Sequence, residues 1–161
     1  MNFNKLLVLI ALFFSNFIIA QDFDMVDGQT VNTDQGNFFD PGGDAASVDQ
    51  GTYTYTICPE STGFFSTISF SEFLLGPHTL TIYDGDSDAA PVLASYTGSI
   101  DGNGPVSGQL LSATDATPTG CLTFVLEAST SNNPTFTGWI AEIGTQPGCI
   151  PDAPELVNTN N

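Results

Sequence analysis

The stretch Phe70-Ser-Glu-Phe-Leu-Leu-Gly-Pro-His-Thr-Leu-Thr-Ile-Tyr-Asp-Gly-Asp-Ser-Asp-Ala-Ala-Pro91 constrains how the rest of this chain can fold. Within it, Leu80 and Ile82 alternate with threonine and tyrosine, which is the two-residue period of a strand with one buried face. Gly76-Pro77 before them and Asp84-Gly85 after them carry turn chemistry. We therefore expect a strand, a tight turn, a second strand and an acidic loop in immediate succession, with the other strands pairing to them.

Short alternating segments separated by turn residues make up most of the remaining chain. The strand candidates are residues 29–33, 36–39, 52–57, 64–73, 80–83, 92–97, 108–112, 122–127 and 139–143. After the first twenty residues, no segment of ten or more residues has an apolar stripe at helical spacing. This pattern predicts an all-β fold, an antiparallel β-sandwich of jelly-roll type.

The domain organisation follows from the same pattern. Residues 21–28 are acidic and aperiodic, so we expect a flexible lead-in, followed by the sandwich over residues 29–145. Residues 146–161 are rich in Pro and Asn, which predicts a linker-like or frayed tail.

Residues 1–20 have the pattern of a secretory signal peptide. Lys5 precedes an apolar run, and Ala20 stands just before the first polar residues of the following segment. A membrane anchor is the alternative, but the run is short for a bilayer and is interrupted at Ser15-Asn16. We expect cleavage after Ala20, a secreted or cell-surface location, and no membrane insertion of the mature chain.

The charge balance excludes several classes of partner. The chain has 18 Asp and Glu, and removal of Lys5 with the signal peptide changes the formal net charge from −17 to −18. Nucleic acid and anionic membranes are excluded as partners because both are bound through Lys and Arg. The acidic surface keeps an exported protein soluble, or it recruits cations such as calcium.

Three cysteines in an exported chain predict one disulfide and one leftover thiol, and three pairings can be drawn. Cys58 ends one alternating segment and Cys121 begins another. We prefer Cys58 with Cys121, because antiparallel neighbours would bring these two ends together. Cys149 is then unpaired, or bonded to something outside this chain.

Five motifs resemble a CUB domain, particularly the versions in bacterial surface and secreted proteins. They are Gly36-Asn-Phe-Phe-Asp-Pro-Gly-Gly43, Tyr53-Thr-Tyr-Thr-Ile-Cys-Pro59, Leu80-Thr-Ile-Tyr-Asp-Gly85, Gly120-Cys-Leu-Thr-Phe124 and Gly138-Trp139. The resemblance covers roughly residues 29–143. It implies a jelly-roll sandwich that is extracellular, usually non-catalytic, binds proteins or glycans, and is often part of a larger polypeptide.

The departures from the family pattern concern calcium and cysteine. Many CUB domains hold calcium with one Glu and two Asp, and by resemblance these positions are Gly76, His78 and Ser131 or Asn132. The resemblance therefore implies that the family calcium site is lost here. Bacterial relatives often pair a cysteine at the place of Asp34 with one after the Trp strand, which by resemblance leaves Cys149 without a partner.

A different cation site is suggested by Asp84, Asp86 and Asp88, which have the spacing that opens an EF-hand loop. The rest of that loop fails, because Ala89 stands where Gly is needed and Ser95 where a bidentate Glu is needed. The two interpretations are a weak calcium site and a solvated acidic hairpin loop. No cofactor is required by either.

Candidate binding residues are Tyr53, Tyr55 and His78. Tyr53 and Tyr55 alternate with threonines and would offer rings to a sugar or protein if that face were outward; core packing is the alternative for both and for Trp139. His78 is the only histidine, and its place after Gly76-Pro77 predicts an exposed turn residue.

No catalytic constellation is found in the sequence. A Ser-His-Asp or Cys-His arrangement would need His78, and no nucleophile motif accompanies it. Acidic residues on strand patterns are expected to point into solvent; they are Glu72, Glu127 and Glu142. We therefore expect no enzyme activity.

Three functions remain. The first is a non-catalytic extracellular binding or adhesion module that recognises a protein or glycan through loops and one sandwich face. The second is a structural subunit or fragment of a bacterial cell-surface assembly. The third, a secreted hydrolase, is the least favoured.

Overall fold

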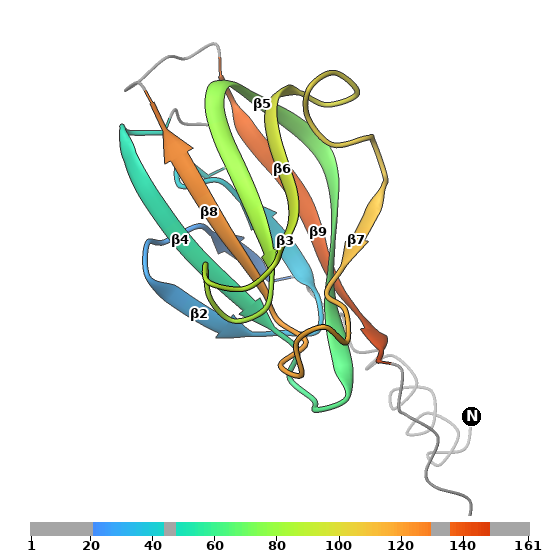
Figure 1. The fold of residues 1–161 in the computed structure, drawn as a ribbon. Helices are drawn as coiled ribbons and strands as arrows, with labels where there is room; N and C mark the ends of the chain where they lie inside the picture. The colour runs from blue at the N-terminus through green and yellow to red at the C-terminus, as the bar shows by residue number, and fades with distance from the viewer. Residues whose placement is uncertain (1–20, 44–47, 130–135, 149–161) are drawn as a thin grey trace, which may run out of the picture.

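The computed structural model describes residues 21–43, 48–129 and 136–148, which form nine strands and no helix (Figure 1). The strands are β1 (Asp22–Asp24), β2 (Gln29–Asn32), β3 (Gly36–Phe39), β4 (Gly51–Cys58), β5 (Phe64–Asp84), β6 (Val92–Ser99), β7 (Leu110–Ser112), β8 (Leu122–Ala128) and β9 (Gly138–Pro147). The all-β prediction is confirmed. Within these residues there is also no helix of the length and apolarity that a membrane span needs.

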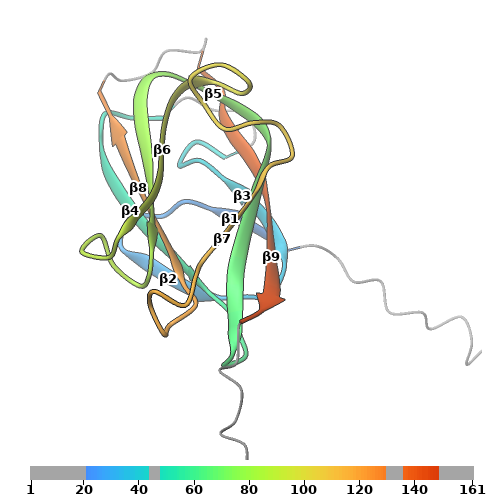
Figure 2. The same cartoon turned by 45° about the vertical axis from the view of Figure 1, so that its right-hand side comes forward.

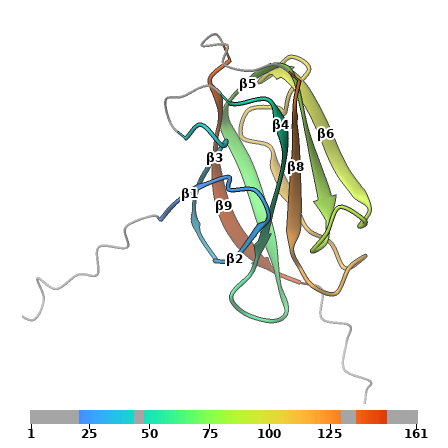
Figure 3. The same ribbon diagram turned by 90° about the vertical axis from the view of Figure 1, so that its left-hand side faces the viewer.

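The strands form one hydrogen-bonded sheet that folds over into two layers (Figures 2 and 3). One layer has the order β1-β3-β9-β5-β7 and the other has the order β2-β4-β8-β5-β6. Most neighbours are antiparallel, as expected, whereas β1 runs parallel to β3 and β2 runs parallel to β4. The result is the jelly-roll-like sandwich that the spacing of the strands predicts.

Strand β5 belongs to both layers. Its first part pairs with β9 from Phe64 to Leu74, and its second part pairs with β8 from Thr79 to Asp84. The predicted tight turn at Gly76-Pro77 is therefore wrong, since the chain continues as one strand of 21 residues. Gly76 has a φ of 57°, and the register against β6 shifts on both sides of it. These irregularities bend the strand from one layer into the other.

The ends of the domain are more ordered than the sequence pattern indicates. The predicted flexible lead-in, residues 21–28, contains β1 and the buried side chain of Met25. Strand β9 extends to Pro147, past the predicted boundary at residue 145. Both extensions are held by pairing to distant strands, β1 to β3 and β9 to β5, which a local pattern does not show.

The core between the layers is built largely of aromatic rings. Phe38 lies 5.2 Å from Tyr55, 4.9 Å from Phe124 and 5.7 Å from Trp139, measured between ring centroids. A second group joins Phe70, Phe73 and Tyr96 in edge-to-face contacts. Burying a large apolar side chain contributes roughly 1.5–3 kcal/mol, so these rings supply much of the driving force for folding.

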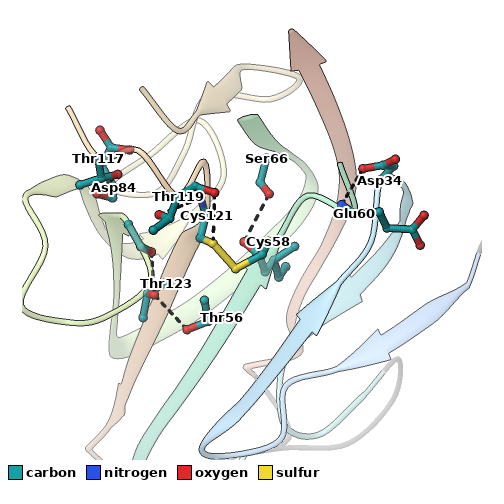
Figure 4. Close-up of a disulfide and its surroundings, with 12 residues drawn as sticks. Asp34, Thr56, Cys58, Glu60, Ser66, Asp84, Thr117, Thr119, Cys121 and Thr123 are labelled. Atoms are coloured by element: carbon teal, nitrogen blue, oxygen red, sulfur yellow. Dashed lines mark hydrogen bonds between the residues drawn. A yellow bond between two sulfur atoms is a disulfide. The ribbon is translucent and has the colours of Figure 1, made fainter. Parts of the chain in front are cut away.

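The disulfide between Cys58 and Cys121 is confirmed, and it joins the end of β4 to the residue before β8 (Figure 4). The two Cα atoms are 4.2 Å apart, and 63 residues separate the cysteines in sequence. A loop of this length gives a stabilisation of about 4 kcal/mol in the chain-entropy model. Cys149 lies outside the described residues.

One close approach makes glycine necessary at residue 138. Gly138 has a φ of 77°, and a Cβ there would overlap the carboxylate of Asp40, which is fully buried. Gly63 has a similar φ of 85°, but a Cβ there would meet no atom within 4 Å. The two glycines thus share the backbone requirement and differ in the available space.

We predict that Gly138→Ala is much more destabilising than Gly63→Ala. The Gly63 change costs about 1–2 kcal/mol for left-handed backbone strain. Gly138→Ala should cost about 2–4 kcal/mol more, because it also displaces Asp40 from its hydrogen bonds. Urea unfolding of both variants measures the difference, and equal losses would show that Asp40 is not tightly held.

Candidate functional site

Asp40 is a fully buried carboxylate without a cation. Its Oδ1 accepts a hydrogen bond from the backbone N of Gly42 at 2.8 Å, and its Oδ2 accepts one from the backbone N of Trp139 at 3.2 Å. Burial is the main cause that raises the pKa of Asp40 to about 6; the charge of Asp24 contributes to the rise, and backbone hydrogen bonds, including those from Gly42 and Trp139, oppose it. Asp40 therefore links the end of β3 to the start of β9 as a structural group.

His78 is buried, so the prediction that it is an exposed turn residue is wrong. Because β5 runs through this point as a strand, the imidazole is directed inward instead of into a turn. Its Nδ1 accepts a hydrogen bond from the backbone N of Ser129 at 3.0 Å, and its ring contacts Phe136 edge-to-face at 5.9 Å. Burial lowers the pKa of His78. The His78 ring therefore packs inside the domain, against Phe136 and the backbone of Ser129.

Tyr53 and Tyr55 occupy different environments. Tyr55 is 1% exposed and stacks on Phe38, so it belongs to the core and cannot offer its ring to a ligand. Tyr53 is half-buried against the core, and its hydroxyl donates to the backbone carbonyl of Asp49 at 3.2 Å. Of the three candidate binding residues, Tyr53 alone reaches the surface.

The three carboxylates of the acidic loop do not converge. Asp84 is buried and accepts hydrogen bonds from the backbone N of Thr114 at 2.9 Å and from the Thr114 hydroxyl. Asp86 and Asp88 are exposed. Asp84 therefore fastens the loop that precedes β8 to the end of β5. In the described ranges, no group of three or more His, Cys, Asp or Glu side chains could hold a metal ion.

The surface hollows formed by the described residues include two with volumes of about 310 Å³ or more. One, of about 310 Å³, lies close to the disulfide and is lined by Gln21, Thr33, Asp34, Gln35 and Glu60. There the Glu60 backbone N donates to Asp34 Oδ1 at 3.0 Å, so Asp34 holds the loop that follows β4 (Figure 4).

The other hollow, of about 370 Å³, is a groove across the outer face of strands β3, β9 and β5. Its lining includes Asn37, Ser69, Ser71, Ser107, Ile140 and Glu142. We call it the β9 groove, because β9 is its central strand.

No protein-family model matches the sequence, and no curated protein matches it either. Solved structures do match. The CUB1-EGF-CUB2 domains of rat MASP-1 align with a TM-score of 0.58 at 18% identity, over 73% of this chain and 42% of that one. The full extracellular region of zebrafish Gpr126/Adgrg6 aligns with a TM-score of 0.55 at 17% identity, over 74% of this chain and 14% of that one.

This chain has a CUB-like fold. The Ca²⁺-bound MASP-1 CUB2 domain, a single module, aligns over 74% of this chain and 99% of its own, with a TM-score of 0.50 at 15% identity. This chain spans less than half of the longer MASP-1 and Gpr126 fragments. At these identities the likeness concerns the fold.

The positions that correspond by resemblance to calcium ligands in CUB domains are packed around Phe136 in this CUB-like chain. A Cβ at Gly76 would overlap the Phe136 ring, and the same ring contacts His78. The ring of Phe136 thus lies beside two of the positions at which the resemblance leads us to expect no calcium ligand. Ser131 and Asn132, the third position, lie outside the described residues.

Neither the burial of Asp40 nor the β9 groove could be predicted from the sequence pattern. Asp40 stands in an Asp-Pro-Gly-Gly stretch that indicates only a turn, and its partner Trp139 is 99 residues away. The outward positions of Glu72, Glu127 and Glu142, by contrast, follow from strand alternation, and all three are exposed. What alternation does not show is that the loop after β6 borders Glu142 and turns that part of the sheet into a groove.

Asp40 should make folding stability depend on pH. Its pKa is 3.8 when unperturbed and about 6 in the fold, so the native state binds the proton more tightly. Stability should therefore rise as pH falls from about 7 to about 4, by roughly 2–3 kcal/mol from this group. Comparing urea unfolding of the wild type and Asp40→Asn across this range isolates the effect from that of the other carboxylates. If the free energies of unfolding of the wild type and Asp40→Asn changed in parallel with pH, Asp40 would have the pKa of a solvent-exposed carboxyl group, and the prediction would be wrong.

Asp84 should differ from the two aspartates that follow it. Asp84→Ala leaves the Thr114 backbone N–H unpaired and should cost about 1–3 kcal/mol. Asp86→Ala and Asp88→Ala should each stay within about 0.5 kcal/mol, because both side chains are exposed. Thermal unfolding with and without calcium completes the test. A large calcium-dependent rise in Tm that is lost in all three variants would instead identify the loop as a cation site.

Proposed function

We propose that this chain is a non-catalytic, extracellular interaction module that recognises a protein or glycan through exposed loops and one sandwich face. The observation that carries the proposal is the CUB-like fold. The solved structures that share it include an extracellular region and multidomain fragments in which the CUB unit is one module. A small rigid sandwich of this kind positions loops and faces for recognition.

Two features of the chain support export, and a third concerns its partner. The disulfide between Cys58 and Cys121 suits an oxidising compartment. Residues 1–20 have the signal-peptide pattern, and we propose that the mature chain begins at Gln21. The absence of Lys and Arg after residue 5 speaks against nucleic acid as a partner.

The placement of most titratable candidates supports a non-catalytic function. Glu127 lies on β8 in one layer and Glu142 lies on β9 in the other, so these two glutamates do not form a pair. Glu72 is opposite Ile140 and shares a sheet face with Glu142, so this pair is included in the test for turnover. Buried His78 and core-packed Tyr55 offer no acid or base at the surface. A hydrolase would need paired acidic groups around a substrate cleft.

A second proposal rests on Cys149, the cysteine left over from the disulfide. If Cys149 forms a bond to another chain, the protein is a subunit of a larger surface assembly, joined near its C-terminal end. Electrophoresis of the exported protein under reducing and non-reducing conditions separates the two proposals. A monomer with one titratable thiol supports the interaction module, whereas a covalent oligomer supports the subunit.

The proposed function is tested on the full chain expressed for export. Mass spectrometry of the exported protein should find Gln21 as its first residue. A glycan array and a binding assay against purified extracellular proteins should then yield a saturable ligand. Turnover of a glycan or peptide substrate, abolished by substitution of Glu72, Glu127 or Glu142, would overturn the non-catalytic assignment.

A further inference from the structure

A row of side chains crosses the β9 groove and continues beyond its lining to Leu110 on β7. The register places Asn37 on β3 opposite Glu142 on β9, Glu142 opposite Ser69 on β5, and Ser69 opposite Leu110 on β7. Paired residues of neighbouring strands point to the same face of a sheet. Asn37, Glu142, Ser69 and Leu110 therefore form one line across the outside of the layer.

The two ends of this row differ in chemistry. At the β3 end, the Asn37 side chain donates a hydrogen bond to Asp22 Oδ1 at 2.8 Å, which fixes the amide and adds a second carboxylate. At the β7 end, Leu110 is 57% exposed, and Val106, which directly precedes the groove residue Ser107, is 58% exposed. The groove thus runs from an acidic end to an apolar rim.

Among the described residues, the charge of Glu142 has no cationic partner. These residues contain no Lys or Arg, and the one histidine is buried on β5. Asp22 is hydrogen-bonded to the groove residue Asn37, and Glu72 is opposite the groove residue Ile140, so the nearest further charges are also negative. A partner with cationic side chains complements this field, and association with such a partner is electrostatically steered.

We propose that the β9 groove binds an extended segment of a partner protein, with a Lys or Arg side chain of that segment paired to Glu142 and an apolar side chain seated against Leu110 and Val106. The inference rests on the proposed interaction function and names the face and the partner chemistry. An extended chain suits a groove whose floor is a sheet, because its side chains alternate at the same spacing as the rows beneath them.

Two other occupants fit less well. A second copy of this chain brings no Lys or Arg after residue 5, so two copies would repel each other at this face. A sugar usually stacks on an exposed aromatic ring. Phe70 lines the groove, but it is 1% exposed and its ring packs in the core.

The probe is a capped hexapeptide of alternating Lys and Leu, and its control has Gln in place of each Lys. Each is titrated into the ¹⁵N-labelled exported full chain, and chemical-shift changes locate the contact. The Lys peptide should shift the amide signals of Asn37, Ser69, Ser107 and Glu142, and the Gln peptide should bind at least about tenfold more weakly, as expected for loss of charge-assisted hydrogen bonds.

Two matched variants distinguish a site from diffuse attraction. Glu142→Gln should weaken binding of the Lys peptide about tenfold, whereas Glu127→Gln, an exposed strand glutamate on the other layer, should change it less than twofold. Leu110→Ser, at an exposed position, should also weaken it. Circular dichroism of each variant verifies the fold.

The result that would overturn the proposal is equal weakening by Glu142→Gln and Glu127→Gln, or shifts spread over all acidic surfaces. Binding confined to another face would also overturn it, while leaving the interaction function intact. If maltohexaose shifts the groove signals and the Lys peptide does not, the groove is a glycan site and the proposed partner is wrong.

Discussion

Strand β5 cannot be removed from either layer without opening both. It pairs with β9 and β7 in one layer and with β8 and β6 in the other, so the backbone hydrogen bonds of four strands end on it. The bend between its two parts falls at Gly76, where a positive φ and the ring of Phe136 leave no room for a side chain. Because the same strand is part of both layers, its inward residues Phe70 and Leu80 pack into a single core.

The second constraint is the lack of cations. In the described residues, buried carboxylates are satisfied by backbone N–H groups and hydroxyls: Asp40 by Gly42 and Trp139, and Asp84 by Thr114. Because these donors are neutral, no second charge has to be buried beside the carboxylate. The hydrogen bonds also fix the loops in which the donors lie. The described residues contain no Lys or Arg that could form an ion pair with the exposed carboxylates. The fold therefore presents a surface of one sign, and its complement must be supplied by whatever it binds.

An aromatic contact joins the bend of β5 to the segment that precedes β9. The ring of Phe136 lies where a Cβ at Gly76 would be, and it also contacts the ring of His78 edge-to-face. The bend of β5 is therefore covered by a packed side chain that comes from a distant part of the sequence.

Local alternation and composition were sufficient to predict the strands, the all-β class, the partnership of Cys58 with Cys121 and the outward direction of the strand glutamates, and five short motifs carried the resemblance to CUB domains. These features recur at every second residue or lie at strand ends, so they can be recognised from short stretches of sequence.

Contacts between distant segments determined the features that the sequence pattern did not predict. Asp40 is buried because Gly138 and Trp139 pack over it. Trp139, whose backbone N donates a hydrogen bond to Asp40, is 99 residues away in the sequence. His78 points inward because its ring accepts a hydrogen bond from the Ser129 backbone and packs against Phe136. β5 is one strand because it pairs with β9 in one layer and with β8 in the other. Burial of a polar group is a property of the packed neighbours, and only the folded chain brings those neighbours together.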